Sequence, residues 1–543
     1  IGVSTAKDGL FFGRLQGEVI YHVDTACGRR DNTIWYVYQD REQGVWCALN
    51  DGIARIEFPG PLTYFQEANG FSGSAQDLLR HQNRLYVAAS PAGSFSLGSR
   101  MTTHGLSQAF FYPVEGISTQ SWELAAVDTQ LLVATNTGIY SISQERAQPL
   151  LPSESLESSF LLPSRFYPDR LFVGLFDGAA VLKNANNTWS IETVIEGIGS
   201  EVRSMVEENA QTLWCGTRSN GVYRVHLDDV DGFQIERVQH FSTEHGLPSG
   251  QIFVFLIENK VVITTESQGI FSFEESETYF YPDSSFGAQF ADGSIDVEII
   301  AASPESDRLW FGAEEAGSIS QLKRQSDGVY EIEATSLARL PKTAIRALYP
   351  DQNDILWAST NDGLFRYDPA LDKQLNLPYP AFIRRIMLSP DSLIFGGTAH
   401  GDASPLSTFP HPLNSLRFEF SAPSYDAAGS LQFQTYLHGF DEQWSFWTNE
   451  SWKEFTNLSP GMYTFQVRAK NAYDLLSEPA TFSFRVLPPW YRTLWAYGLY
   501  ALVLGGLLFA VDRVQRRRLT NKAQERMRVA LLEAEHRRKS EEL

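Results

Sequence analysis

One short pattern recurs ten times in the first 410 residues and constrains the fold more than any other feature. Each copy has an apolar residue, a bulky residue, a second apolar residue and a small residue, followed by a polar turn that ends on Gly. Successive bulky positions lie 35 to 48 residues apart, which is the size of one four-stranded propeller blade. The copies begin at Leu10, Val45, Leu85, Leu131, Leu171, Leu213, Val261, Leu309, Leu356 and Leu393.

The chemistry of the pattern fits a blade. A run of four apolar or small residues is typical of a strand buried on both faces, and a small fourth residue suits the crowded region where strands converge on an axis. Asn-Asp-Gly at 50–52 and 361–363, and Ser-Asn-Gly at 219–221, supply the positive φ angles of tight hairpin turns. The sequence therefore predicts an all-β body built from repeated hairpins.

Ten blades exceed the four to eight of a typical ring. We expect residues 1–410 to contain one complete ring of about seven blades, with residues 1–105 as the end of a preceding propeller. One irregular ring is the alternative. At 40–56, 211–225 and 351–367 the chain resembles the two-component regulator propeller (Reg_prop) repeats, with the pattern Asp-x-x-Gly-x-Leu-Trp-x-Gly-Thr-x-x-Gly-Leu-x-x-Tyr. The copy at Val261 lacks the Trp, and Gly401 is followed by Asp402 instead of an apolar strand.

From residue 411 to 488 the strands become longer. Residues 416–420, 431–437 and 463–468 alternate apolar and polar side chains, which predicts an antiparallel, immunoglobulin-like β-sandwich. The segment resembles the triple-tyrosine (Y_Y_Y) domain, with Phe455 where the family has its middle Tyr. The resemblance implies a coupling domain just outside a membrane. The motif residues are Tyr436, Gly439, Phe440, Asp441, Trp444, Phe455, Pro460, Gly461, Tyr463 and Arg468.

Residues 494–511 carry no charge. A transmembrane helix needs roughly 20 residues, and an interfacial turn at 490–493 completes a span over 490–512. Aromatic residues lie before it and arginines follow it, so the positive-inside rule predicts a cytoplasmic C-terminus. A buried core helix is the alternative, although it leaves these flanks unexplained. The boundary residues are Trp490, Tyr491, Trp495, Arg513, Arg516, Arg517 and Arg518.

Residues 513–543 form an expected charged helix, in which Met527, Ala530 or Leu531, and Ala534 have coiled-coil-like spacing. The pattern alone indicates an exposed helix, whereas the resemblance implies a cytoplasmic signalling helix in a homodimer. The chain has neither an initiator Met nor a charged-then-apolar leader, and it stops within a helical charge pattern. We therefore expect truncation at both ends.

Charge excludes one class of partner. The tail 513–543 holds ten Lys and Arg against five Glu, a net +5, which leaves 34 Lys and Arg against 60 Asp and Glu, a net −26, in residues 1–512. Such a body repels phosphate backbones, so we expect no nucleic-acid binding. Three cysteines are too few for a disulfide framework. Cys47 and Cys215 occupy apolar repeat positions and are expected to be buried. Cys27 lies in an expected polar loop, either as a free thiol or, alternatively, in a disulfide bridge.

The sequence offers no catalytic constellation, no phosphate-binding loop and no cysteine and histidine cluster with metal-ligand spacing. We therefore expect no catalytic, cofactor or metal residues, and ligand-contacting residues cannot be chosen. A carbohydrate-active propeller enzyme is an alternative because 40–46 resembles sialidase turns, although Tyr38 stands where those have Ser or Thr. Glycosidases also need two positioned carboxylates, and the sequence identifies no pair.

The resemblances imply the sensory and coupling portion of a bacterial single-pass receptor in the inner membrane. Its propeller and sandwich are expected to be periplasmic or extracellular, and to bind a small molecule or oligosaccharide. The expected output is a cytoplasmic domain beyond Leu543, a serine/threonine phosphatase or a histidine kinase. A membrane-anchored surface propeller without signalling output is the second hypothesis.

Overall fold

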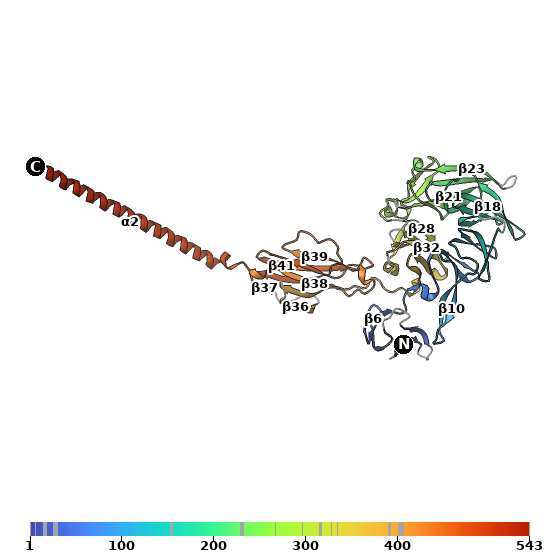
Figure 1. Ribbon diagram of the computed structural model, residues 1–543, viewed down its shortest axis with the longest axis horizontal. Coiled ribbons are helices and arrows are strands. Elements are labelled where there is room, and N and C mark those ends of the chain that lie inside the picture. The colour runs from blue at the N-terminus through green and yellow to red at the C-terminus, as the bar shows by residue number, and fades with distance from the viewer. Residues whose placement is uncertain are drawn as a thin grey trace. The chain divides into compact units, whose positions relative to one another are not determined.

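The computed structural model describes the whole chain except residues 1, 6, 15–18, 25–30, 152–155, 229–232, 267, 296, 314–317, 327, 334, 341, 389–391, 400–406 and 542–543. Two compact units make up the chain, Ile1–Leu377 and Pro378–Leu543, and each is described by itself (Figure 1). Strands form most of the regular structure of the described residues, so the expected all-β class is confirmed. Cys27 lies outside the described residues.

Seven four-stranded sheets form the main body of the first unit. In chain order, six of them are β8–β11, β12–β15, β16–β19, β20–β23, β24–β27 and β28–β31, and the seventh combines β32–β34 with β7. The strands of the first three sheets are β8 (Ser74–His81), β9 (Arg84–Ser90), β10 (Gly93–Met101), β11 (Ser107–Pro113), β12 (Ser121–Val127), β13 (Gln130–Thr135), β14 (Gly138–Ser143), β15 (Arg146–Pro149), β16 (Ser158–Pro163), β17 (Arg170–Leu175), β18 (Gly178–Ala185) and β19 (Thr188–Ile195).

The other four sheets follow the same plan, and a short helix α1 (Ala288–Ala291) lies between the fifth and the sixth. Their strands are β20 (Val202–Asn209), β21 (Thr212–Thr217), β22 (Val222–Asp228), β23 (Gln234–Phe241), β24 (Ile252–Ile257), β25 (Lys260–Thr265), β26 (Gly269–Glu274), β27 (Tyr279–Pro282), β28 (Ile299–Ala302), β29 (Arg308–Ala313), β30 (Ser318–Arg324), β31 (Tyr330–Glu333), β32 (Ile345–Pro350), β33 (Leu356–Thr360), β34 (Gly363–Tyr367) and β7 (Leu62–Phe65).

The seven sheets close into a ring. The first strand of each sheet contacts the first strand of the next, from β8 through β12, β16, β20, β24 and β28 to β32, and β32 contacts β8 again. The last blade takes its outer strand from the other end of the ring, because β7 pairs antiparallel with β34 and sets Phe65 opposite Leu364. The expected complete ring of about seven blades is therefore confirmed, and it runs from β7 to β34.

Six more strands precede the ring, in two three-stranded sheets of described residues. The expected boundary near residue 105 does not fit the structure. The sheet β8–β11 belongs to the ring because β8 contacts both β32 and β12, so only residues before β7 lie outside the ring. The six strands are β1 (Gly2–Ser4), β2 (Leu10–Gly13), β3 (Val19–Val23), β4 (Ile34–Gln39), β5 (Gly44–Leu49) and β6 (Gly52–Glu57).

The small fourth residue of the repeat lies where blades meet. A Cβ atom on Gly216 would come within 2.5 Å of the carbonyl oxygen of Ile252 in the next blade, and one on Gly174 would come within 2.8 Å of the carbonyl oxygen of Val202. Neither glycine has a positive φ angle, so close approach and not backbone conformation excludes a side chain. The expected crowding between converging strands is confirmed.

The acidic residue six positions before the repeat's Trp has a specific partner. The indole N–H of Trp46 donates to Asp40, that of Trp214 donates to Glu208, and that of Trp357 donates to Asp351, at 2.8, 2.8 and 3.2 Å. A buried indole N–H without an acceptor would be costly. This hydrogen bond explains why the repeat pairs an acid with a Trp at that spacing.

The second unit contains a β-sandwich of two four-stranded sheets, in the orders β36-β35-β38-β40 and β37-β42-β41-β39. Their inner faces share one core that includes Phe418, Phe465 and Phe484. The strands are β35 (Phe382–Leu388), β36 (Ser392–Ala399), β37 (Ser407–Phe409), β38 (Leu416–Ser421), β39 (Gln432–His438), β40 (Trp452–Phe455), β41 (Gly461–Lys470) and β42 (Ala480–Val486).

The tenth copy of the repeat, at Leu393, is not a blade. Its strand β36 pairs with β35, and β35 pairs with β38 of the sandwich. The division therefore falls after Leu377 and not at residue 410 as expected. The pattern occurs both in the blades and in the sandwich because it specifies only a strand of a hairpin. The domain to which the hairpin belongs depends on the strand with which it pairs.

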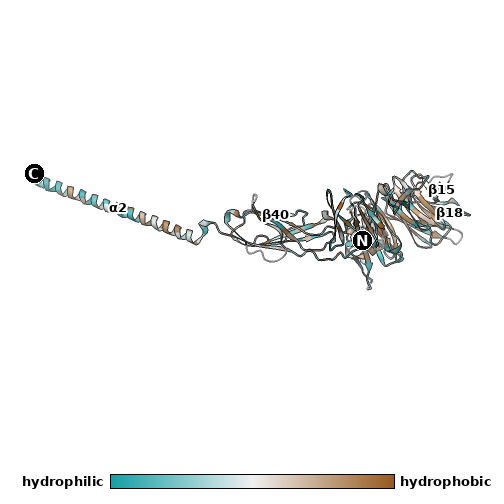
Figure 2. Cartoon of the chain, turned by 90° about the horizontal axis from the view of Figure 1, so that it is seen from below, coloured by the Kyte–Doolittle hydropathy of each residue, from teal (hydrophilic) through white to brown (hydrophobic). Residues whose placement is uncertain are grey.

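A single helix ends the chain. A short 3₁₀ turn, η10 (Trp490–Arg492), precedes the helix α2 (Leu494–Glu541), which has 48 residues. Figure 2 shows that the first part of α2 is hydrophobic and that the remainder is hydrophilic. Within α2 only Ala496 is buried.

Candidate functional site

The first strands of the seven blades surround a cavity of about 360 Å³ in the ring. Five of the seven strands, β8, β12, β16, β20 and β32, have a register shift there against the second strand of their blade. A β-bulge adds an unpaired residue and re-aims its side chain. The residues at these shifts all line the cavity: Gln76, Trp122, Glu123, Ser159, Arg203 and Arg346.

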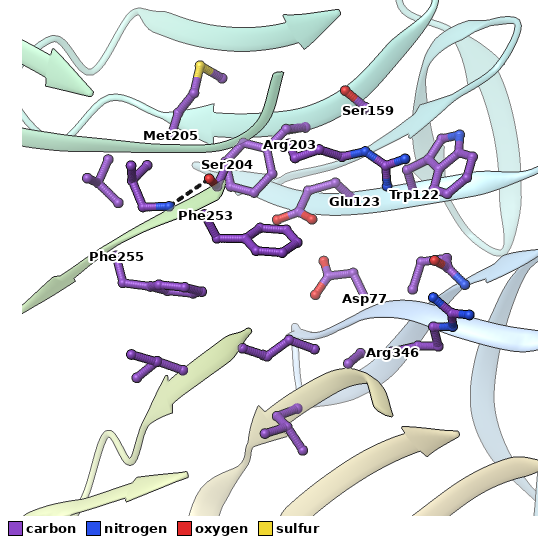
Figure 3. A pocket seen from close by; sticks show the side chains of 18 of the residues that line it. Asp77, Trp122, Glu123, Ser159, Arg203, Ser204, Met205, Phe253, Phe255 and Arg346 are labelled. Atoms are coloured by element: carbon purple, nitrogen blue, oxygen red, sulfur yellow. Dashed lines mark hydrogen bonds between the residues drawn. The ribbon is translucent and has the colours of Figure 1, made fainter. Parts of the chain in front are cut away.

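Two carboxylates lie together in this cavity. Figure 3 shows the side chains of Asp77 and Glu123, from neighbouring blades, extending into the same space. An oxygen of Asp77 accepts a hydrogen bond of 2.8 Å from the backbone N–H of Leu124, next to Glu123. Within the described part of the chain, the Glu123 carboxylate has no hydrogen bond or ion pair with the protein.

Burial shifts both acids toward their protonated forms. Loss of solvation raises the pKa of Asp77 to about 7, although hydrogen bonds from the Leu124 and Leu78 backbone N–H groups oppose the shift. Loss of solvation also raises the pKa of Glu123 well above its ordinary value, and the negative charge of Asp77 adds to the effect. Both carboxyl groups therefore favour the neutral form more than a solvent-exposed acid does.

Aromatic and cationic side chains form the rest of the wall. Trp122 and Phe253 line the cavity together with Met205 (Figure 3). The guanidinium of Arg203 lies 5.5 Å from the ring centre of Trp122, and its Nε lies 2.8 Å from an oxygen of Glu201. Burial lowers the pKa of Arg203, while the charge of Glu201 opposes that effect.

This arrangement suits binding better than glycoside hydrolysis. A glycosidase uses one protonated acid and one ionised carboxylate as base or nucleophile. In this cavity both acids are shifted in the same direction, and the structure places no cation in contact with either carboxylate in the described residues. A cavity of this size with a few convergent polar groups and aromatic walls is typical of a small-ligand site.

The sequence did not single out Asp77 or Glu123. The available signal is weak: a polar residue follows a small or apolar one near the start of several first strands, as in Ala75-Gln76, Val202-Arg203 and Ile345-Arg346. Period-two alternation misses these positions, because a bulge changes the register at the cavity.

The predicted coupling motif lies in the second unit, where it stabilises the sandwich. Gly439 has φ +93°, and a Cβ atom there would come within 2.9 Å of the carbonyl oxygen of Met462. Asp441 then accepts a 2.8 Å hydrogen bond from the backbone N–H of Leu437. These two residues hold the turn that follows β39. Pro460 precedes Gly461, the first residue of β41.

The aromatic members of the motif fill or border the sandwich core. Phe455 is buried, and its ring contacts those of Phe418, Phe465 and the more exposed Phe440 edge-on. Tyr463 is also buried, and its hydroxyl donates to the carbonyl of Ser459 at 2.7 Å. Phe455 thus keeps the expected core position without a hydroxyl.

Arg468 organises the outer face of β39 and β41. Its guanidinium donates twice to the side-chain oxygen of Gln434, at 3.0 and 2.7 Å, and lies 4.4 Å from the ring centre of Trp444. The ring of Tyr436 lies 5.7 Å from that of Trp444. These three motif residues therefore pack against one another on the outer face of the sheet that contains β39 and β41.

The residues of the predicted membrane boundary lie in η10, at the start of α2 and near its middle. The rings of Trp490 and Trp495 stack at 6.0 Å, and α2 is long and apolar enough to be a candidate membrane span. Asp512 pairs with Arg516 at 2.8 Å at the hydrophilic end of the apolar stretch. Arg513, Arg517 and Arg518 are exposed on the same part of the helix.

The two cysteines at repeat positions lie in the hydrophobic core. Cys47 and Cys215 are fully buried, as expected, and burial raises the pKa of the Cys215 thiol to about 12. Among the described residues, no group of three or more metal-ligating side chains could hold a metal ion.

Comparison with known proteins agrees with this architecture. Residues 424–487 match the Y_Y_Y domain family, which confirms the resemblance seen in the sequence. The chain is 22% identical over 403 residues to histidine kinase P4 of Formosa agariphila, covering 71% of this chain and 28% of that protein. The chain therefore spans little more than a quarter of that relative.

A solved structure has a similar fold. The extracellular domain of a hybrid two-component system from B. thetaiotaomicron superposes with a TM-score of 0.66 at 18% identity, over 90% of this chain and 66% of that one. The extracellular domain of a one-component system from the same organism superposes with a TM-score of 0.45 at 14% identity, over 89% of this chain and 67% of that one. The first of these superpositions shows that this chain and that extracellular domain have a similar fold.

Proposed function

We propose that this chain is the ligand-sensing and membrane-coupling portion of a bacterial signal-transduction receptor. One observation carries the proposal: a Y_Y_Y sandwich is joined through only seven residues, 487–493, to an apolar helix with aromatic residues before it and arginines after it. Because this connector is short, a rearrangement of the sandwich is expected to move the helix directly. The likenesses to a histidine kinase and to an extracellular domain of a two-component system support this assignment.

In this proposal the propeller and sandwich lie outside the inner membrane and the end of α2 lies in the cytoplasm. A ligand, for which an oligosaccharide is the default class, changes the arrangement of two copies of the chain by binding one arrangement more tightly. The helix then passes this change to a cytoplasmic output domain. A histidine kinase or a serine/threonine phosphatase is the proposed output.

Topology provides the first test. Alkaline phosphatase, which is active only outside the cytoplasm, and a fluorescent protein that matures only inside it are each fused after residue 488 or after residue 541. We expect phosphatase activity at the first site and fluorescence at the second. Neutralising Arg513, Arg516, Arg517 and Arg518 should weaken this orientation, whereas neutralising the distant Arg537, Arg538 and Lys539 should not. Fluorescence at residue 488 in the unaltered chain would contradict the proposal.

The gene provides the second test. The codons after Leu543 should encode a kinase, a phosphatase, a cyclase or a DNA-binding domain. A stop codon immediately after Leu543 would instead favour a surface-anchored binding protein without an output.

We further propose that the chain acts as a homodimer through the hydrophilic part of α2. Met527 and Leu531, four residues apart on α2, are each about two-thirds exposed. They form an apolar strip that is available to a second helix. In membranes, M527C should form a disulfide-linked dimer more readily than R526C, which changes the neighbouring face. Equal cross-linking of the two variants would contradict a specific helix pair.

Residues 2–57 are proposed to be the last blades of a preceding propeller. The sheet β4-β5-β6 has three strands. In the same way, β32–β34 supply only three strands of the seventh blade, and β7 adds the fourth. On β4, Trp35, Tyr36 and Tyr38 are each more than half exposed, which is typical of a surface that packs against further blades. Added upstream sequence should protect these three residues from solvent in oxidative labelling, and unchanged labelling would contradict the proposal.

A further inference from the structure

The carboxylate pair in the propeller cavity is not required by the ring itself. A propeller axis can be filled by apolar or neutral side chains, and burying a carboxylate without a compensating partner costs free energy. Here β-bulges on β8 and β12 bring Asp77 and Glu123 into the same cavity, and both remain without a cationic partner within the described residues. Such an arrangement is expected to be stabilised by a positive group from outside the protein.

We propose that the propeller cavity binds a ligand through an ammonium group held between the carboxylates of Asp77 and Glu123. A cation there would offset the repulsion between the two carboxylates, and a protonated amine would also donate hydrogen bonds to their oxygens. The aromatic wall favours the same chemistry, because a cation is attracted to the face of Trp or Phe. Trp122 already has the guanidinium of Arg203 over its ring.

An organic ammonium fits this cavity better than a metal ion. Ca²⁺ takes six to eight oxygen ligands, whereas much of the wall around Asp77 and Glu123 consists of Trp122, Phe253, Met205 and aliphatic residues. The cavity volume of about 360 Å³ is in the range of small-molecule sites. The same ammonium chemistry could come from a polyamine, a quaternary amine or an amino sugar.

Other charged groups around the pair have their own partners. Arg203 on β20 pairs with Glu201, and Arg346 on β32 donates to the side chain of Asn361 at 3.2 Å. Tyr349, also on β32, lies near Asp77, and its hydroxyl accepts a 3.0 Å hydrogen bond from the backbone N–H of Arg80. Arg80 itself pairs with Asp351. The acid pair therefore remains the available anionic group in the cavity.

Proton competition gives the site a measurable signature. The ammonium group binds the ionised carboxylates, while burial raises the pKa of Asp77 to about 7. Affinity for a permanently charged ligand should therefore increase as pH rises through 7, and binding should release protons to the buffer. Choline is a suitable probe because its charge does not change with pH.

The test uses the full chain in detergent and isothermal titration calorimetry with choline, spermidine, glucosamine, N-acetylglucosamine and calcium chloride. We expect at least one ammonium compound to bind and N-acetylglucosamine, which lacks the ammonium group, not to bind. Asp77→Asn and Glu123→Gln should each weaken that binding at least tenfold. The matched control Glu115→Gln, which changes an exposed acid paired with Arg146, should leave it unchanged. Thermal unfolding of each variant verifies that the ring is intact.

Several results would overturn the inference. These are an absence of binding for every ammonium probe, equal binding by the two cavity variants and the control, or tight calcium binding that the cavity variants abolish. Hydrolysis of a bound saccharide would also overturn it, because the site would then be catalytic. The topology of the membrane helix is measured separately, so failure of this inference leaves the receptor proposal standing.

Discussion

Closure of the ring by a strand from its other end makes Phe65 a point where one substitution should loosen the whole propeller. Phe65 is 4% exposed on β7, and its ring lies 5.4 Å from both Phe111 in the first blade and Trp357 in the seventh. Phe65→Ala removes these contacts and leaves a cavity at the seam. Replacing a buried Phe by Ala costs about 3–5 kcal/mol.

At this domain size each kcal/mol lowers the Tm by about 2 °C, so the propeller transition should fall by about 6–10 °C. Differential scanning calorimetry measures that shift, and hydrogen exchange should show lost protection in both β7 and β34, which pair with each other. Thr63→Ala is the control, because Thr63 is exposed on the same strand and should change the Tm by less than about 1 °C. Equal shifts for the two variants, or full protection of β34 in Phe65→Ala, would refute closure by β7.

Three further predictions follow from single contacts. Burial would raise the pKa of Asp351, but the hydrogen bonds that it accepts from Arg80, Gln352 and Trp357, together with the charge of Arg80, outweigh burial and lower that pKa. Asp351→Asn should cost about 2 kcal/mol at pH 7. Because the pKa of Asp351 is lower in the folded than in the unfolded chain, the stabilisation by this carboxylate is fully present above pH 3.8 and is lost as the pH falls through the lower folded pKa. The free energies of unfolding in urea of the two proteins should therefore converge below pH 4. Gly216→Ala should cost about 1–3 kcal/mol through overpacking, whereas Gly199→Ala, where a Cβ meets open space, should be nearly neutral in the same assay. Tyr463→Phe should lose about 1 kcal/mol because its hydroxyl bonds Ser459, and an unchanged urea midpoint would contradict that role.

The blades were predictable because their information is local. A strand buried on both faces, a small residue and a Gly turn recur within about a dozen residues, and Gly52, Gly221 and Gly363 do adopt positive φ angles. Other turns gave no such signal. Two hairpins have consecutive non-glycine residues with positive φ angles, at Asn186 and Asn187 and at Glu258 and Asn259. Such pairs are typical of type I′ turns, but these turns lack the glycine that would have predicted them.

The features that sequence reasoning missed are non-local. The pairing of β7 with β34 joins residues about 300 positions apart, and nothing in the four residues of β7 distinguishes it from the fourth strand of another blade. The copy at Leu393 has the blade pattern, but its neighbour β35 pairs with β38 of the sandwich. Asp77 and Glu123 meet only because seven first strands converge, and the bulges that aim them are set by pairing between strands.

The structure also separates two kinds of aromatic residue that the sequence presents alike. In the blades, Trp214 and Trp357 are buried and donate to an acid six residues earlier, so they stabilise the fold. Trp490 in η10 and Trp495 at the start of α2 are each more than half exposed and have no such acceptor in the described residues. An exposed pair of stacked indoles is unfavourable in water but suits a membrane interface, where the ring meets lipid and the N–H meets water. Burial and hydrogen-bond partners, more than composition, therefore assign the first pair to the propeller core and support a membrane boundary at the second.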